Sequence, residues 1–343
     1  MRFSLFSILI VAAFIACTNT VSMPAEDDDT STASSSSKKE TVNEDGKSSS
    51  GKEQTEECVG DVGKPWNGTT AKEFACGAGT KLSPYIILTA EQLAKLSFIV
   101  GSNDKAYQGK YYKLGADIQL NEGKIIDDKG ALVGDSTKLH KWTPIGNSSV
   151  AFTGNFDGDG HSVSGMFINT TSTHNGLFGN SSGTVQNLKV ENSWVSGGKF
   201  TAGVIGRNTD SVINVNNLAS VFGKDECIGG VIGSSYQKDN KTNSVIKKVT
   251  NNGFVIGDKN VGGVAGCASY VTVDGAENTV AIEGFGYVGG LFGGIGSSSK
   301  NDVKNLKNIG SVTGKHFVGG ISGYCGGSVT LNDLALNKTS SYS

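Results

Sequence analysis

The side chains that could bind a metal or transfer protons are few in this sequence and lie far apart. Its four histidines are His140, His161, His174 and His316, and none has a second histidine within one helical turn. The sequence contains no HExxH motif. A zinc site needs three or four clustered histidine, cysteine or carboxylate ligands. The sequence therefore predicts no metal site and no other cofactor, and it favours histidines placed in loops and corners.

Carboxylates cluster at one glycine-rich turn, FDGDGHS, residues 156–162. Asp157 and Asp159 form a D-x-D pair of the kind that could ligate calcium. The calcium loop of helix-hand proteins needs further acids and a glutamate at its twelfth position, where this sequence has Ile168. Glycine and aspartate are also the residues that tight turns select. We therefore expect a turn that caps the start of the repeat region rather than a metal site.

A recurring glycine-rich stretch indicates the kind of structural element that would carry a functional site in this chain. YVGGLFGGIG (287–296) looks like a phosphate-binding loop, but a nucleotide site uses one such loop between a strand and a helix. The six copies here end at Gly179, Gly206, Gly233, Gly266, Gly293 and Gly323, at intervals of 27, 27, 33, 27 and 30 residues. A period of about 20–50 residues indicates stacked structural units. The stretch is therefore interpreted as a corner and the strand that leaves it.

Each repeat unit reads as three short strands. After the glycine stretch comes an apolar pair such as Val212 and Val215, and then a closing stretch such as FVIG (254–257). These runs are too short for helices and are rich in β-branched residues. Val231 and Val264 are expected at matching interior positions of adjacent coils.

Stacking of these units predicts an all-β fold, a parallel β-helix with one coil of about 27–33 residues per repeat. Asn187, Asn214 and Asn305 recur at one position, as expected for a corner with left-handed backbone angles. We expect the solenoid to be right-handed, because right-handed crossovers predominate.

The repeats also carry a family resemblance. The G-[LVI]-[FIAS]-G units and the preceding WTPIGNSSVAFTGNFDGDGHSVSGMFIN (142–169) resemble the GLUG-motif repeat proteins of bacterial surfaces. GAGTKLSPYIILTAEQLAKL (77–96) and YYKLGADIQL (111–120) resemble the segment that precedes such repeats, and the likeness covers about residues 60–336. The resemblance implies a pectin-lyase-like β-helix of the adhesin type. Some relatives append a metallopeptidase domain, for which this sequence lacks the HExxH motif.

The N-terminal segment predicts export. An apolar run from Leu5 to Ala16 suits a secretion signal and is too short for a permanent membrane span. Its end, FIAC, resembles a lipobox with Cys17 as the lipidated residue, and Thr18 favours the bacterial outer membrane by family analogy. Ordinary secretion without lipid is the alternative.

Four regions follow from these boundaries. They are a signal peptide (1–16), a serine-rich, acidic and disordered tether (17–57), an N-terminal cap (58–141) and the repeat β-helix (142–338). The lysines after the tether are scattered and form no basic stripe, so no nucleic-acid partner is predicted.

The cysteines divide into two groups. Cys58 and Cys76 bracket a short segment in an exported chain, and we expect a disulfide between them. Cys227, Cys267 and Cys325 occupy three different positions relative to the glycine stretches. They are interpreted as buried small apolar residues that form neither metal sites nor disulfides.

Aromatic residues supply the candidate binding site. Phe200, Tyr287 and Phe317 take the same place, three residues before the second glycine of the corner pair, and could form a stripe, suited either to sugar faces or to mutual packing. The second candidate is the insertion SSYQKDNKTN (234–243), which contains Tyr236.

A binding module is favoured over an enzyme. A β-helical polysaccharide lyase or hydrolase needs acids that converge on one face. The acids of the repeats occupy different repeat positions; they are Asp225, Asp258, Asp274, Glu283, Asp302 and Asp333. The sequence predicts a non-catalytic, lipid-anchored surface module for adhesion to, or binding of, an extracellular glycan or host protein, with a secreted carbohydrate-active enzyme as the alternative.

Overall fold

The computed structural model describes residues 58–237, 239, 241–296, 301–326, 334–336 and 340–342. The predicted signal peptide, the predicted lipidation site Cys17 and the predicted tether lie outside the described residues.

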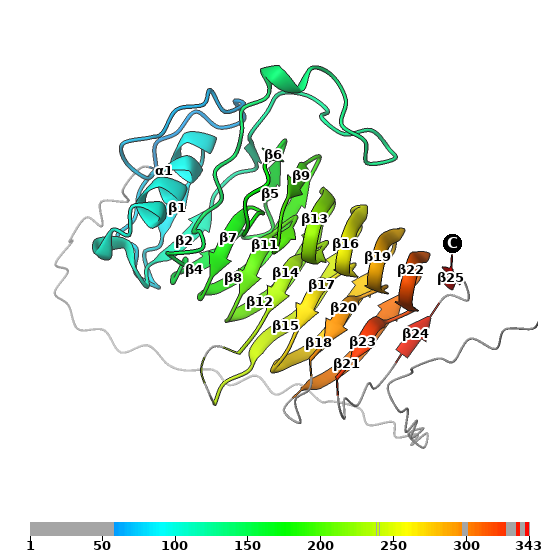
Figure 1. Cartoon of the computed structure of the whole chain (residues 1–343). Helices are drawn as coiled ribbons and strands as arrows, with labels where there is room; N and C mark the ends of the chain where they lie inside the picture. Colours follow the sequence, from blue (N-terminus) through cyan, green and yellow to red (C-terminus); the bar gives the residue numbers. More distant parts are fainter. Residues whose placement is uncertain are drawn as a thin grey trace, which may run out of the picture.

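Three parallel sheets run along the length of the molecule (Figure 1). The first sheet contains β1 (Tyr85–Ile87), β2 (Tyr111–Leu114), β3 (Ile118–Gln119), β4 (Asn155–Asp157), β5 (Ser162–Ser164), β8 (Thr184–Glu191), β12 (Ser211–Asn217), β15 (Ser244–Asn251), β18 (Val271–Asn278), β21 (Asp302–Asn308) and β24 (Leu334–Leu336). The second sheet contains β6 (Phe167–Asn169), β9 (Trp194–Gly197), β10 (Thr201–Ala202), β13 (Ser220–Gly229), β16 (Val255–Gly262), β19 (Ile282–Gly289), β22 (Val312–Gly319) and β25 (Ser340–Tyr342). The third sheet contains β7 (Phe178–Ser181), β11 (Ile205–Asn208), β14 (Ile232–Ser235), β17 (Ala265–Ala268), β20 (Phe292–Ile295) and β23 (Ser322–Cys325).

The chain visits the three sheets in turn and then begins the next coil, as β12, β13, β14 and β15 illustrate. Neighbouring coils pair in parallel and nearly in register: Val212 pairs with Val185 in the preceding coil and with Ile246 in the next. The predicted parallel β-helix with three strands per coil is confirmed. The right-handed winding of its coils stays a prediction. The first sheet begins with β1 and β2, so it extends into the segment expected to form a cap.

The interior is filled by columns of aliphatic side chains. Val231 and Val264 are both fully buried, as predicted from the repeat. The corner at YVGGLFGGIG lies between β19 and β20, and a side chain on Gly290 would place its Cβ 2.2 Å from the Gly320 carbonyl oxygen of the next coil. Glycine is required there because neighbouring backbones approach closely.

The recurring asparagines adopt the predicted left-handed conformation. Asn187, Asn214 and Asn305 have φ angles of 53°, 53° and 57°. They lie within the strands of the first sheet, where Val212 and Val215 pair with the next coil on either side of Asn214. Each asparagine therefore marks a kink inside a long strand.

A second column of asparagines is buried and was not predicted from the sequence. Asn217, Asn251, Asn278 and Asn308 are between 0 and 2 % exposed. The Nδ2 of each of the first three donates to the Oδ1 of the next, over 2.9 Å from Asn217 to Asn251 and 2.8 Å at each of the two following steps, and Asn308 Nδ2 donates to the Gly320 carbonyl over 2.9 Å. Each Nδ2 also donates to the carbonyl oxygen two residues further along its own chain. This asparagine ladder satisfies polar groups at the turn between the first and second sheets.

The N-terminal end of the solenoid carries helix α1 (Ala90–Gly101) and the short 3-10 helices at Lys105–Tyr107 and Ser136–Lys138. Thr89 and Gln92 form a capping box that fixes the start of α1, and Leu93 and Leu96 pack into the core. None of the helices in the described residues is long and apolar enough to cross a membrane.

Candidate ligand-binding site

The predicted aromatic stripe is interrupted in the structure. Phe200, Tyr287 and Phe317 do share one column, and all three have left-handed backbones with φ of 60°, 54° and 53°. Two intervening coils place Cys227 and Asn260 in the same column, with φ of 63° and 52°. The column position was predicted correctly, but the three rings do not form one continuous stripe.

The two C-terminal members of the column form part of a larger group of rings, here called the aromatic patch. It consists of Phe285 and Tyr287 on β19, Phe317 on β22 and Tyr324 on β23. The Tyr287 and Phe317 rings stack with centroids 4.7 Å apart and an interplanar angle of 13°. The Tyr324 ring meets Tyr287 edge-on at 5.6 Å.

Much of the aromatic patch faces solvent. Phe285, Phe317 and Tyr324 are 54, 50 and 48 % exposed. Lys315 Nζ lies 5.1 Å from the centroid of the Phe285 ring. Exposed rings on neighbouring coils offer flat apolar faces to a ligand, and a tyrosine hydroxyl adds a hydrogen-bonding group at the edge.

Phe200 has a different environment. Its ring lies edge-on to His174 at 5.0 Å, with Lys199 Nζ 5.0 Å from the ring centroid. Burial lowers the pKa of His174, and the positive charge of Arg207 lowers it further. Phe200 is half-buried and packs within the column, so it does not join the aromatic patch.

Tyr236 lies just after β14, is 40 % exposed and meets Tyr270 edge-on at 5.3 Å. It belongs to the predicted insertion 234–243, of which residues 238 and 240 lie outside the described residues. The ring contact with Tyr270 links two adjacent coils, away from the aromatic patch.

The predicted Cys58–Cys76 disulfide is present, with Cα atoms 4.8 Å apart. It ties the start of the described chain to the segment before β1, where Cys76 also bridges to Ile86. Structural disulfides are typical of oxidising compartments, and the predicted export would take the chain to one.

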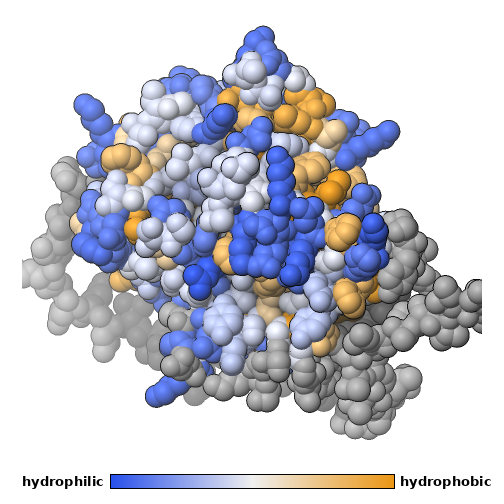
Figure 2. Space-filling model, viewed as in Figure 1, coloured by the Kyte–Doolittle hydropathy of each residue, from blue (hydrophilic) through white to orange (hydrophobic). Residues whose placement is uncertain are grey.

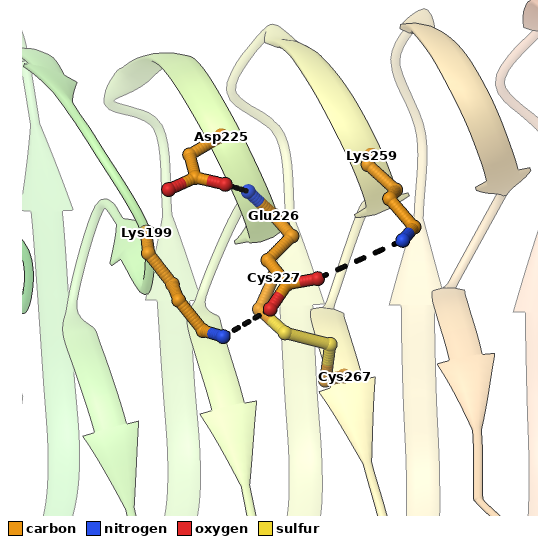
Figure 3. The surroundings of a disulfide bond; sticks show 6 residues. All are labelled: Lys199, Asp225, Glu226, Cys227, Lys259 and Cys267. Atoms are coloured by element: carbon orange, nitrogen blue, oxygen red, sulfur yellow. Dashed lines mark hydrogen bonds and ion pairs between the residues drawn. A yellow bond between two sulfur atoms is a disulfide. The ribbon is translucent and has the colours of Figure 1, made fainter.

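The interpretation of Cys227 and Cys267 as unbridged residues is wrong. They form a disulfide between adjacent coils, with Cα atoms 5.0 Å apart (Figure 3). The bond joins β13 to β17, two strands of different sheets in adjacent coils. The two cysteines can meet because Gly266 has no side chain, so the backbone of β17 packs closely on residue 227. A Cβ on Gly266 would lie 2.4 Å from the Cys227 carbonyl carbon. Cys325 is also disulfide-bonded, so the interpretation is wrong for all three.

Charged residues surround the inter-coil disulfide (Figure 3). Glu226 lies between Lys199 and Lys259, in contact with the first and 3.9 Å from the second. The hydrogen bond from Lys199 holds the pKa of Glu226 below its usual value against the opposing effect of burial, and both lysine charges add to this. The group links three coils electrostatically.

The FDGDGHS turn is held by contacts within the chain. Burial alone would raise the pKa of Asp157, but hydrogen bonds from Asn187, the Asp159 backbone and Gln186 lower it. Asp159 forms an ion pair with Lys113 over 2.8 Å. Within the described residues, no group of three or more histidine, cysteine or carboxylate side chains is placed to hold a metal ion.

Comparisons with known proteins support the fold. A crystal structure of a "putative immunoglobulin A1 protease" from Bacteroides ovatus is similar with a TM-score of 0.54 and 23 % identity, over 78 % of this chain and 76 % of that one. At that identity the likeness shows the fold alone.

Two sequence relatives are known by name. Halomucin from Haloquadratum walsbyi is 32 % identical over 178 residues, which is 49 % of this chain and 2 % of halomucin. A "Putative Gly-rich membrane protein" of Evansella cellulosilytica is 32 % identical over 146 residues, which is 41 % of this chain and 15 % of that protein. The chain therefore spans only a small part of either relative. No family model matches the chain, so the resemblance to GLUG-motif repeats stays a prediction.

Proposed function

We propose that this chain is a non-catalytic, cell-surface β-helical module that binds an extracellular glycan or surface protein through the aromatic patch. The observation that carries the proposal is the exposure of Phe285, Phe317 and Tyr324 on neighbouring coils. Packing within the fold does not require rings that are half exposed, whereas binding to a sugar face or an apolar protein surface does.

The surface location is supported by two independent features. The Cys58–Cys76 and Cys227–Cys267 disulfides are typical of exported proteins. The two sequence relatives are named halomucin and a Gly-rich membrane protein, and both names suit proteins at the cell surface. Specifically, we propose that the protein is located at the outer membrane and is anchored there by a lipid on Cys17.

Removing two exposed rings tests the binding function. Phe317→Ala/Tyr324→Ala should lower the affinity for the best ligand on a glycan and protein array by about 1–3 kcal/mol, since each ring contributes about 0.5–1.5 kcal/mol. Titration calorimetry with the full chain measures the loss. Phe98→Ala, which removes a 65 % exposed ring on α1, is the control and should bind normally.

Two outcomes of this experiment would count against the proposal. If the double variant loses thermal stability while its folded fraction binds normally, the patch serves packing. If wild-type protein releases reducing ends or unsaturated products from a polysaccharide, and one carboxylate replacement abolishes the release, the alternative carbohydrate-active enzyme is correct.

The lipid anchor makes a separate prediction. Wild-type protein should fractionate with membranes, whereas Cys17→Ala should accumulate as an unlipidated precursor, because the acyl chains supply the membrane affinity. Cell fractionation with mass spectrometry of the N-terminal peptide distinguishes the two forms. Equal release of both proteins as soluble, cleaved chains would show that the protein is freely secreted.

A further inference from the structure

The inter-coil disulfide is one member of a repeated diagonal contact. Cys227 belongs to the column of left-handed residues that contains Phe200, and it meets Cys267 on β17 of the next coil. Two coils later, Tyr287 in the same column meets Tyr324 on β23 of the coil that follows it. A residue of the left-handed column therefore lies beside the third-sheet residue one coil further on.

The same register places His174 beside Arg207. Asn175 pairs with Thr201 in the next coil, so His174, with φ of 64°, precedes Phe200 in the left-handed column. Arg207 on β11 holds the third-sheet position of the coil after His174, just as Cys267 does for Cys227. Burial lowers the pKa of His174 and the Arg207 charge lowers it further, as expected for neighbouring side chains.

Arg207 carries a positive charge that the fold does not neutralise. Its side chain is half-buried, and in the described part of the chain its guanidinium forms no ion pair and donates no hydrogen bond. Ser234, its half-buried neighbour in register on β14, has no hydrogen bond from its hydroxyl to another described residue. The Glu226 carboxylate is already paired with Lys199 and Lys259 (Figure 3). Arg207 is therefore available to an anion from outside.

The column that contains Arg207 leads to the aromatic patch. The register of the third sheet places Ser234, Cys267, Gly294 and Tyr324 after Arg207, one in each coil. Arg207 and Tyr324 are thus four coils apart, about 19 Å at a spacing of about 4.8 Å per coil. Figure 1 shows the third-sheet strands side by side along the solenoid, and Figure 2 shows hydrophilic residues across the middle of the same view.

We propose that the aromatic patch and Arg207 bind one acidic glycan chain, whose rings pack on the patch while a carboxylate or sulfate further along the chain binds Arg207. The inference rests on the proposed function and names the class of its ligand. The planar guanidinium donates two parallel N–H bonds to such an acid group, and the Ser234 hydroxyl is placed to donate a third. Lys315, beside Phe285, supplies a second cation at the patch. An acidic peptide without rings would leave the patch unused.

A glycan array probed with the full chain tests the ligand class. The array pairs each acidic glycan with its uncharged counterpart: uronate chains with their methyl esters, and sulfated chains with their desulfated forms. The strongest signals should come from acidic members, because the uncharged forms lose the bond to Arg207. Whether carboxylated or sulfated chains dominate identifies the acid group. Titration calorimetry then compares the tightest acidic chain with its uncharged counterpart.

Arg207→Gln should lower the affinity for the acidic chain at least about tenfold and leave that for the uncharged counterpart within about twofold. Arg207→Lys keeps the charge but not the planar fork, so its loss should be intermediate. Lys247→Gln makes the same charge change at an exposed residue of β15 in the first sheet, and this control should bind normally. Thermal unfolding of all three variants should match wild type.

The ring variant Phe317→Ala/Tyr324→Ala should weaken binding of both members of the pair. If it does so while Arg207→Gln changes nothing, the aromatic patch binds as proposed and the acid-binding site is wrong. If the ring variant changes nothing, both proposals fail. The inference would also be overturned by an array on which no acidic glycan binds or uncharged chains bind best. A hexaglutamate peptide that binds as tightly as the best acidic glycan, and depends on Arg207, would contradict it too.

Discussion

Val264→Asp is expected to unfold the stacked coils cooperatively and to lower the free energy of unfolding by at least about 3 kcal/mol. Val264 is fully buried at the corner between β16 and β17 and belongs to the continuous hydrophobic core. A carboxylate there would have to be buried without a partner or protonated, and either state costs free energy. Thermal and denaturant unfolding of the full chain measure the loss.

Ile256→Asp is the matched control for this substitution. Ile256 lies on the neighbouring strand β16 but is 42 % exposed, so its aspartate stays in water and should cost about 1 kcal/mol or less. If the two variants unfold with the same midpoint as wild type, Val264 faces solvent and the interior of the solenoid has been assigned to the wrong face.

Breaking the asparagine ladder is expected to cost a similar amount. Asn251→Leu removes one bond from Asn217, one to Asn278, and bonds to both the backbone N–H and the carbonyl of Gly253. Leucine leaves these buried groups unpaired, each at about 1–3 kcal/mol, so the free energy of unfolding should fall by about 4 kcal/mol. Denaturant unfolding followed by circular dichroism measures the change.

The neighbouring Asn252→Leu provides the comparison. Asn252 points to the outer side and is half-buried, with bonds to Asn216 and Thr279. Because water can replace those partners, its loss should cost about 1 kcal/mol or less. Equal stability of the two variants would mean that the ladder contributes nothing beyond the packing of the coils.

The repeat made most of the fold predictable, because a residue in one coil lies above its equivalent in the next. The corner glycines, the valine columns and the left-handed asparagines all follow from this rule. The asparagine ladder shares the same period, with intervals of 34, 27 and 30 residues from Asn217 to Asn308, and could have been found by the same reasoning. Thr89 and Gln92 match the capping-box pattern, so the start of α1 could also have been predicted from the sequence.

The inter-coil disulfide escaped prediction because it depends on a contact outside the columns. Comparing positions within columns excluded a Cys227–Cys267 bond, whereas the tight corner brings residues of different columns together diagonally. The loop after β3 occurs once and has no repeat to align, so its course could not be predicted from the repeat either.

The inter-coil disulfide also determines how the molecule would respond to a pulling force. Coils of a solenoid contact mainly their neighbours, so tension on one end would peel them off one after another. Cys227 and Cys267 are 40 residues apart in the sequence. Because their disulfide is covalent, it transmits the tension directly, and the chain between the two cysteines is not stretched. About 140 Å of chain, at roughly 3.5 Å per residue, is thereby withheld from extension. If the module adheres to a moving surface, the two coils joined by this disulfide would stay together while the coils beside them unfold under tension.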